Sequence, residues 1–483
     1  MDNNDRSLSI FGNPIPKHTY NKAMKQKARF AKKFGFNPND RYELSALPNP
    51  ILKKYCNLYT VSQEEGSEIA KSKSIIIGTI RMGYGHYRIA MAIASAAHSM
   101  GIVPYWFDLL SFDTAGAKII KHMDNLYSFG SRLSQQFYLF NKLYWEHLTA
   151  IGFKKLTYNA TDQAMTQLFA NIYQNLPQSV PFVATHAWAS QAAVHAGTKK
   201  VINMIPDNWP LALHLSEGAI HTVQTPSAYF GYRTLKNMGK KNQILNPMPK
   251  DDIYYTGHYV DHELVANVEK DCNARLTRLK NKKPRRFLLS IGGAGAQQKL
   301  CMDIIMHCIP LLENEKLTLI INTGDHKAIF DMILNTGFSP RVPKTSYTQW
   351  AETEKLVNTL TTKDVPGLHI VYNEDIFSAV YATNILMRVC DCLITKPSEL
   401  AFYPVPKLFV AHVGGHEMWG AIRGAEIGDS TVECETVQHT LQAMDLLIYD
   451  DDLLTLYCNN IIKAKSIGIY NGAYEVIKLA FGK

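Results

Sequence analysis

The chain has 483 residues, of which 46% are hydrophobic and 19% charged, and its formal net charge is +9. This composition is typical of a folded protein with two or three domains, and it excludes a disordered chain. It also excludes a membrane-spanning helix, because no apolar run approaches the roughly 20 residues that such a helix needs. The start of the chain lacks a signal-peptide pattern, so we expect a cytoplasmic protein.

The first predicted element is a basic helix. Lys17–Phe36 holds seven Lys or Arg residues and no acidic residue. One side of this helix is apolar and carries Met24, Ala28, Phe30, Ala31 and Phe34. Two interpretations stay open, an element on an anionic membrane surface or a solvated arm. Nucleic acid is not expected as a partner, because basic and aromatic residues do not interleave as they do in single-strand binders.

A strand, a glycine turn and a helix follow at Ser74–Ser99. The β-branched run of Ser74–Thr79 is typical of a buried parallel strand, and Arg88–Ser99 is rich in Ala and Ile at helical spacing. Between them, Gly83-Tyr-Gly-His86 forms a tight turn. A turn of this kind lets the backbone approach a phosphate at a helix N-terminus, although packing alone is a sufficient reason for glycine there.

The same plan returns about 210 residues later. A strand beginning at Arg286 leads into the turn Gly292–Gln297 and then into a helix at Leu300–Leu312. Further short apolar runs predict strands at 182–185, 201–205, 221–224, 252–256, 317–322, 368–372, 390–394 and 408–410. Two strand–turn–helix units, each opening an alternation of strands and helices, predict an α/β protein with two doubly wound Rossmann-like domains that face a central cleft.

Several motifs in their order resemble the family 28 glycosyltransferases, which have the GT-B fold. They are Gly83–His86, Ile205-Pro-Asp207 with His214 and Gly218, Thr256–Asp261, Gly292–Gln297, Asp391–Lys396 with Glu399 and Pro406, and His412–Gly420 with Gly428. The pattern is most similar to the monogalactosyldiacylglycerol synthase and diacylglycerol glucosyltransferase group. It is more distantly similar to the peptidoglycan N-acetylglucosaminyltransferase. The resemblance covers roughly Ser74–Ala480, in pieces.

The resemblance implies a division of the chain into four parts. Residues 1–70 would be an N-terminal basic extension, and 71–268 a Rossmann-like domain that binds the acceptor. Residues 269–470 would be a Rossmann-like domain that binds the nucleotide sugar, and 471–483 a C-terminal helix that packs back on the first domain.

The resemblance also implies an inverting transfer of a sugar from a nucleotide-diphosphate sugar, expected to be a UDP-sugar. This reaction needs a base for the acceptor hydroxyl and a stabiliser for the leaving diphosphate. Asp207 is the first candidate for the base and His86 the second. For Asp207 the alternative is an ordinary turn residue. Glu399 would accept hydrogen bonds from the ribose, or else interact with a helix dipole.

The remaining candidate residues divide between donor and acceptor. The donor-binding candidates are Gly292, Gly293, Gly295, Lys396, Ser398, Glu399, His416 and Glu417. The acceptor-binding candidates are Gly83, Gly85, His186, His214, Tyr144 and Trp145. The last two belong to Leu126–Phe153, an aromatic segment with basic neighbours that suits either a membrane interface or helix packing. A lipid or lipid-linked acceptor at the inner face of the plasma membrane follows from the resemblance, and a homodimer is a further expectation.

No metal site and no tightly bound cofactor are expected. His412 and His416 are four residues apart, but glycines between them favour a loop over a helix, and no third ligand is evident.

Other functions on the same fold stay open because the chain departs from the family. Asp261 stands where the family has Arg, Gly420 replaces Asn, His416 replaces Gln, and the Lys396–Glu399 loop is short. An anion near a diphosphate is unfavourable. The alternatives are therefore a nucleotide-sugar epimerase and a non-catalytic protein that binds a nucleotide sugar or a partner.

Overall fold

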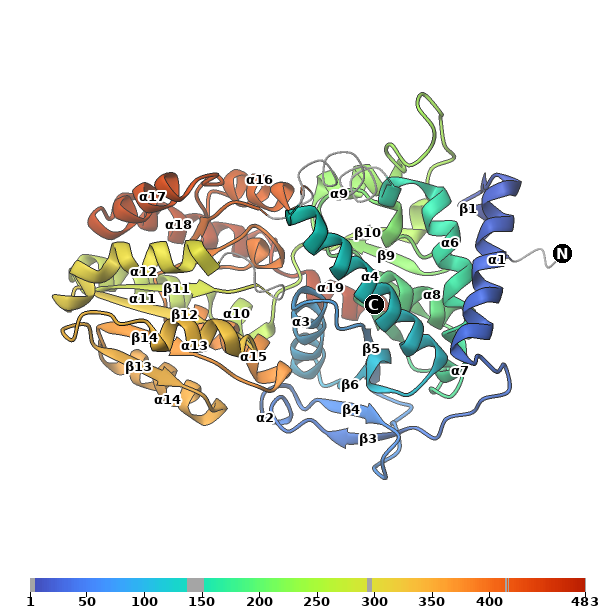
Figure 1. The fold of residues 1–483 in the computed structure, drawn as a ribbon, viewed down its shortest axis with the longest axis horizontal. Coiled ribbons are helices and arrows are strands. Elements are labelled where there is room, and N and C mark those ends of the chain that lie inside the picture. The colour runs from blue at the N-terminus through green and yellow to red at the C-terminus, as the bar shows by residue number, and fades with distance from the viewer. Residues whose placement is uncertain (1–4, 137–151, 293–297, 413–414, 416, 483) are drawn as a thin grey trace. The chain divides into compact units, whose positions relative to one another are not determined.

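The computed structural model describes residues 5–136, 152–292, 298–412, 415 and 417–482. These residues form two compact units (Figure 1). Unit 1 contains residues 1–82, 92–257 and 472–483, and unit 2 contains residues 83–91 and 258–471. The first turns of one helix, α3 (Gly85–Ser99), therefore belong to unit 2 and the rest of it to unit 1.

Unit 1 is built on a sheet with the strand order β10-β9-β8-β7-β5-β6-β4-β3. All its neighbouring strands are parallel except β3 and β4. Its strands are β3 (Ser45–Pro48), β4 (Tyr59–Ser62), β5 (Ser74–Thr79), β6 (Val103–Asp108), β7 (Phe182–Ala184), β8 (Val201–Met204), β9 (Ile220–Val223) and β10 (Ile253–Tyr255). Its helices are α1 (Lys17–Phe34), α2 (Lys53–Cys56), α4 (Ala115–Gln136), α6 (Leu156–Thr166), α7 (Ala170–Tyr173), α8 (Ala187–His195), α9 (Pro226–Arg233) and α19 (Gly472–Phe481).

Unit 2 is built on a parallel sheet with the order β13-β14-β12-β11-β15-β16. Its strands are β11 (Arg285–Ser290), β12 (Leu317–Asn322), β13 (Lys344–Tyr347), β14 (Gly367–Val371), β15 (Cys392–Thr395) and β16 (Lys407–Phe409). Its helices are α10 (His262–Ala266), α11 (Val268–Lys280), α12 (Gln298–Glu313), α13 (Lys327–Asn335), α14 (Trp350–Thr362), α15 (Ile376–Met387), α16 (Met418–Ile427), α17 (Val437–Tyr449) and α18 (Asp452–Ser466).

Each sheet has the strand order of a doubly wound Rossmann-like fold. In unit 1 the order reverses at β5, which lies between β7 and β6, and in unit 2 it reverses at β11, which lies between β12 and β15. The predicted α/β class with two doubly wound Rossmann-like units is confirmed. In such sheets ligands bind beyond the carboxyl ends of the strands, next to the reversal point. The predicted turn at Gly83–His86 follows β5, and Gly292, which is the described residue of the second predicted turn, follows β11.

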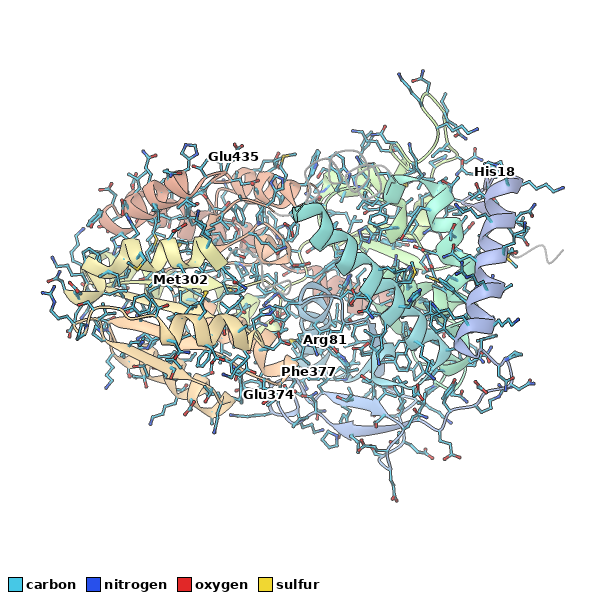
Figure 2. The ribbon with its side chains drawn as sticks, viewed as in Figure 1. His18, Arg81, Met302, Glu374, Phe377 and Glu435 are labelled. Atoms are coloured by element: carbon cyan, nitrogen blue, oxygen red, sulfur yellow. The ribbon has the colours of Figure 1, made fainter. Side chains whose placement is uncertain are left out.

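The N-terminal segment differs from the extension outside the core that the sequence suggests. Strands β3 and β4 form one edge of the sheet in unit 1, and α1 packs against α6 and α4 (Figure 1). Ala23 and Phe30 are buried, whereas Ala28 is exposed. His18, in the first turn of α1, is exposed and points outward (Figure 2). The apolar side of α1 is therefore used in packing within unit 1.

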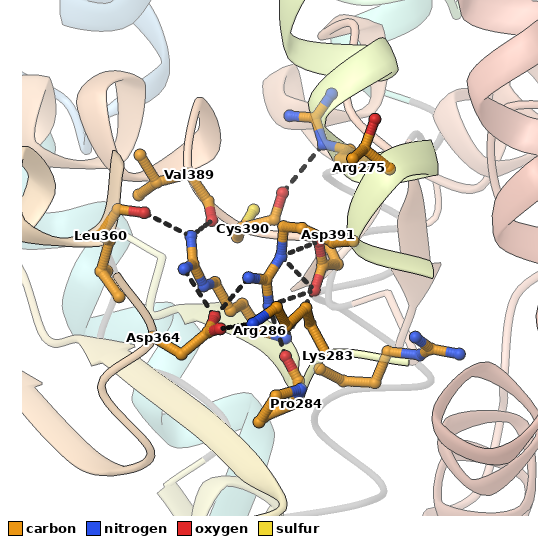
Figure 3. A network of polar contacts seen from close by, with 12 residues as sticks. Arg275, Lys283, Pro284, Arg286, Leu360, Asp364, Val389, Cys390 and Asp391 are labelled. Carbon is orange, nitrogen blue, oxygen red and sulfur yellow. Dashed lines mark hydrogen bonds and ion pairs between the residues drawn. The ribbon is translucent and has the colours of Figure 1, made fainter. Parts of the chain in front are cut away.

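A network of ion pairs joins the amino ends of β11 and β15 in unit 2 (Figure 3). Asp391 accepts a hydrogen bond of 2.8 Å from the backbone N–H of Arg286 and one of 3.1 Å from Nε of Arg278. Asp364 pairs with both arginines. Burial opposes ionisation of Asp364, but these two arginines lower its pKa. Asp391 in the Asp391–Lys396 motif thus holds the strands together, at the end of β15 away from Lys396.

Among the described residues, no helix combines the length and the hydropathy that crossing a bilayer requires. The eight cysteines are all free thiols, and all are buried.

Candidate active site

In unit 1, Asp207 and His214 form a pair beyond the carboxyl end of β8. The Nε2 atom of His214 lies 2.8 Å from Oδ2 of Asp207. The side chain of His214 is 9% exposed and that of Asp207 26%, so the histidine is the inner partner and the carboxylate the outer one. A hydrogen bond from the imidazole orients the carboxylate and leaves it accessible from solvent, which suits a general base.

Two buried asparagines fix the turn that carries His214. Nδ2 of Asn159 in α6 donates to the carbonyl oxygens of Ala212 and Leu215, both at 2.8 Å. Nδ2 of Asn203 in β8 donates to the carbonyl oxygen of His214 at 2.7 Å. Because both ends of the turn are tied to neighbouring elements, the imidazole has a fixed place beside Asp207. The sequence offered no signal for either asparagine, since both lie in segments that read as ordinary helix and strand.

His186, the other predicted acceptor residue beyond a strand of this sheet, serves as a helix cap. Its Nδ1 atom accepts the backbone N–H of Trp188 at 3.1 Å at the start of α8, and the side chain is buried. A capping role satisfies a donor that would otherwise be orphaned at the helix start.

Beside this cap lies a buried carboxyl, Asp162 on α6. Burial raises its pKa to about 7, although a hydrogen bond from the side chain of Trp188 opposes that shift. The Oδ2 atom of Asp162 has no hydrogen-bond partner among the described residues. A substantial share of this carboxyl is therefore protonated near pH 7.

The first glycine turn packs within unit 2. The hydroxyl of Tyr84 donates to Oδ1 of Asp325 at 2.5 Å and accepts the backbone N–H of the same residue at 2.9 Å. A Cβ atom built on Gly85 would lie 1.8 Å from Oε1 of Glu399, so the carboxylate of Glu399 rests directly on the first residue of α3. Gly85 is required by this close approach. His86 follows it in α3 and is half-buried, and Gly83 has a φ of +81°.

Arg88 ties the same turn of α3 to α15. Its guanidinium donates to Oδ1 of Asn384 at 3.1 Å and to Oγ1 of Thr383 at 3.4 Å, and it lies 5.8 Å from the ring centre of Tyr403. Tyr403 in turn donates a hydrogen bond of 2.9 Å to Asp261.

Asp261, the residue at the family's arginine position, is completely buried. Burial raises its pKa to about 6, against the influence of Tyr403 and Arg88. This carboxyl is a structural element of unit 2 with no exposed surface, so it makes no direct contact with a ligand in solvent.

The second glycine turn carries a cation above its first residue. A Cβ atom on Gly292 would lie 3.1 Å from Cε of Lys396, so the lysine stem crosses the glycine. The ammonium of Lys396 forms an ion pair with Glu417, whose side chain is 8% exposed. His326, which the sequence did not single out, approaches the carbonyl oxygen of Gly292 with Nε2 at 3.0 Å. Gly292, Lys396 and Glu417 are thus brought together beyond the carboxyl ends of β11 and β15.

Of the remaining predicted site residues, the structure describes some and not others. Ser398 is half-buried and caps the short 3-10 helix Glu399–Phe402 without a side-chain hydrogen bond. The candidates Gly293, Gly295, His416, Tyr144 and Trp145 lie outside the described residues. His412 pairs through Nδ1 with Glu433 at 2.7 Å. Among the described residues no group of three His, Cys, Asp or Glu side chains could hold a metal ion.

Two family models match the chain. Residues 9–234 match "Domain of unknown function (DUF6937)" and residues 248–481 match "Domain of unknown function (DUF6938)". No curated protein matches the chain.

The solved structures with a similar fold include two epimerases and a synthase. A UDP-GlcNAc 2-epimerase from Neisseria meningitidis bound to UDP-GlcNAc is 10% identical over 85% of this chain and 100% of that one, with a TM-score of 0.42. An alpha,alpha-trehalose 6-phosphate synthase from Burkholderia multivorans is 10% identical over 85% and 98%, with a TM-score of 0.42. A UDP-GlcNAc 2-epimerase from Methanocaldococcus jannaschii in complex with UDP-GlcNAc and UDP is 9% identical over 85% and 100%, with a TM-score of 0.39.

Proposed function

We propose that the protein is an inverting glycosyltransferase that uses a nucleotide-diphosphate sugar, with Asp207 as the base that deprotonates the acceptor hydroxyl. The observation that carries the proposal is the Asp207–His214 pair, an accessible carboxylate oriented by a buried imidazole. In this role His214 is a positioning residue, which donates its Nε2 proton to Asp207 and holds the other carboxylate oxygen toward the acceptor.

In the proposed division of labour, unit 2 binds the nucleotide diphosphate. Gly292 lets the stem of Lys396 cross close to the backbone, and the ammonium of this lysine supplies a positive charge for a phosphate. The ion pair with Glu417 keeps that ammonium in position in the absence of ligand. When a diphosphate arrives, its oxygens would compete with the carboxylate of Glu417 for the ammonium.

For the acceptor we propose a lipid or lipid-linked molecule at a membrane surface. Support comes from α1, whose basic residues Lys22, Lys25, Arg29, Lys32 and Lys33 are exposed while its apolar side packs on unit 1. In this arrangement α1 would contribute charge and no inserted apolar face. Sedimentation with vesicles that contain phosphatidylglycerol tests this part, and unchanged binding after Lys-to-Gln substitution at Lys25, Lys32 and Lys33 would reject it.

The first experiment is a thermal-unfolding assay of the full chain with UDP, UDP-glucose, UDP-galactose and UDP-GlcNAc at millimolar concentration. We expect at least one of them to raise Tm, because a ligand that binds only the folded state stabilises it by mass action. Lack of any shift would reject a nucleotide-sugar function of either kind, transferase or epimerase.

The second experiment uses the donor that binds. Asp207→Asn is expected to lower transfer at least a hundredfold and to leave the affinity for the donor within twofold. Asp113→Asn, which alters a carboxylate with 84% of its side chain exposed in the same unit, is the matched control. Transfer retained by Asp207→Asn would reject the base assignment.

One observation favours a second candidate, a non-catalytic protein that binds a nucleotide sugar. Glu417 already neutralises Lys396, so the stabilisation of a leaving diphosphate by this lysine is weakened at the start. Donor binding without transfer to any acceptor and without conversion of the sugar would decide for this alternative. Interconversion of the free nucleotide sugars would instead indicate an epimerase.

A further inference from the structure

The turn that follows Asp207 is rigidly anchored in unit 1. The carbonyl oxygen of Trp209 accepts a hydrogen bond of 2.9 Å from the hydroxyl of Tyr232, which is completely buried. The same hydroxyl accepts the backbone N–H of Leu211 at 3.3 Å. Pro210 lies so close to Gly231 that a Cβ atom there would be 2.8 Å from it. Trp209 therefore has a fixed backbone two residues after the proposed base.

A lysine lies over the indole ring of this tryptophan. The Nζ atom of Lys154 is 4.3 Å from the ring centre of Trp209, which is within the range of a cation–π contact. Both side chains are half-buried. Burial, together with the positive charge of Lys155, lowers the pKa of Lys154. The ammonium is thus held in a partly desolvated place, which weakens its own hydration and strengthens its attraction for an anion.

The neighbouring Lys155 differs from Lys154 in the partners of its ammonium. The ammonium of Lys155 donates to the carbonyl oxygens of Asn237 at 3.0 Å and Gly239 at 2.6 Å, so it fastens a loop. Lys154 forms no ion pair with a carboxylate in the part of the chain that the structure describes. A half-buried cation without an anion is unfavourable, and an incoming anion would relieve that cost.

We propose that Lys154 binds a phosphate ester of the acceptor, so that the acceptor is an anionic molecule and not a neutral alcohol. This inference rests on the proposed role of Asp207. The Cα atoms of Asp207 and Trp209 are at most about 7 Å apart, because only one residue separates them. The ring that holds the ammonium is therefore carried by the same short turn as the base. The phosphate would be held near the hydroxyl that receives the sugar.

Phosphate is the anion that fits the site best. The ammonium is a compact point charge with three donors, and a phosphate offers several oxygens in place of one carboxylate pair. The positive charge also offsets the repulsion that the acceptor phosphate would feel from Asp207. Trp209 acts as a positioning residue in this scheme, since its ring keeps the lysine in place.

The test measures binding of the full chain, without any nucleotide, to glycerol 3-phosphate and to glycerol by isothermal titration calorimetry. A second arm measures sedimentation with phosphatidylcholine vesicles that contain either phosphatidylglycerol or no anionic lipid. Lys154→Gln removes the charge, Lys154→Arg keeps it, and Lys236→Gln is the matched control on an exposed lysine of the same unit. Circular dichroism melting confirms that each variant is folded.

We expect one of the two phosphate sources to bind at least tenfold more tightly than its uncharged counterpart. Lys154→Gln should abolish that preference, while Lys154→Arg and Lys236→Gln keep it within threefold. Preference for glycerol 3-phosphate indicates a soluble ester, and preference confined to phosphatidylglycerol vesicles indicates a lipid headgroup. Equal binding by Lys154→Gln and the unmodified protein, or no preference for phosphate in either arm, overturns the inference.

The outcome is separable from that of the proposed function. The phosphate-binding assay uses neither donor nor turnover, so it can succeed when the nucleotide-sugar assay fails. Trp209→Phe, which keeps an aromatic face, should retain the phosphate preference better than Trp209→Ala. If both tryptophan variants bind as the unmodified protein does, the positioning role of Trp209 is rejected and only the charge of Lys154 matters.

Discussion

The Nε2 atom of His214 lies 2.8 Å from Oδ2 of Asp207, and the histidine is the more buried of the two. In the proposed mechanism this order of burial separates the two roles, because the accessible carboxylate can reach a substrate while the buried imidazole acts on its neighbour. The main chain around His214 is held by Asn159 and Asn203, so the imidazole cannot easily turn away. The pair is therefore preorganised, and the contributions of its two members can be measured separately by mutation.

We predict that His214→Phe lowers transfer ten- to a hundredfold and leaves the KM for the donor within twofold. His214→Gln should lose less, because an amide can still donate a hydrogen bond to Asp207. The pH dependence of kcat supplies the distinguishing readout, since a buried structural histidine would change stability without moving the profile. The exposed His98, changed to Gln, is the control. An unshifted profile in His214→Phe would remove His214 from the mechanism.

The pairing of Lys396 with Glu417 leads to opposite expectations for its two members. Glu417→Gln frees the ammonium and should tighten UDP binding about threefold to tenfold, whereas Lys396→Gln should weaken it at least tenfold. A tenfold change corresponds to ~1.4 kcal/mol, which is within reach of a partly buried charge. Titration calorimetry with UDP measures both.

A loss of UDP-sugar binding in Glu417→Gln would point to another role for this carboxylate. If Glu417→Gln weakens UDP-sugar binding as strongly as Lys396→Gln does, then Glu417 contacts the donor itself. In that case UDP without a sugar should bind the Glu417→Gln variant as it binds the unmodified protein. A matched change at the exposed Glu435 should have no effect on either ligand.

Local sequence signals were sufficient for the framework of the fold. The run of Ser74–Thr79 is β5 as predicted, and the helix after it begins at Gly85, a few residues before the alanine-rich stretch. These elements have strong periodicity or β-branched residues, which the local chain reveals. The edge strand β3 and its neighbour β4 are four residues each and contain Pro48 and polar residues, so only pairing with the sheet makes them strands.

Side-chain partners far apart in the sequence could not be predicted. Nothing near Glu399 indicates that its carboxylate rests on Gly85, because the contact joins segments more than 300 residues apart. Likewise, a charged Asp261 reads as an anion near a ligand, whereas the fold buries it against Tyr403. Only the tertiary fold decides whether a polar residue faces solvent or the core.

Because Asp162 is buried, we predict that its contribution to stability falls as the pH rises toward 7. Its pKa is about 7 in the folded state, against an ordinary value of 3.8 for an aspartate. The folded state therefore holds a proton that the unfolded state releases. The stabilisation is complete below about pH 4 and is lost as pH rises to about 7. Asp162→Asn, which has no charge to bury, should be more stable than the unmodified protein at pH 8, by a few kcal/mol at most.

Chemical denaturation at pH 4.5 and pH 8 measures this difference in the free energy of unfolding. The advantage of Asp162→Asn should shrink toward pH 4.5, where the carboxyl of the unmodified protein is protonated and uncharged. The exposed Asp113→Asn variant should show no such trend. A constant difference between Asp162→Asn and the unmodified protein at both pH values would contradict the burial argument.

The charge inside β16 gives a prediction about stability alone. Lys407 and Asp429 form an ion pair of 2.8 Å in unit 2, with side chains 0% and 1% exposed. The ammonium also donates to the carbonyl oxygens of Tyr403 and Val405 at 2.9 Å and 3.0 Å, so all three of its hydrogens are used.

Removing one partner of this ion pair leaves the other charge buried, which costs about 3–5 kcal/mol. Lys407→Met should therefore destabilise the protein strongly, and the double variant with Asp429→Asn should recover part of the loss, because it removes the stranded carboxylate. Urea unfolding of the four proteins in the cycle measures the coupling. If the double variant is no more stable than Lys407→Met, the cost lies in the two carbonyl groups that lose their donor and not in the unpaired charge.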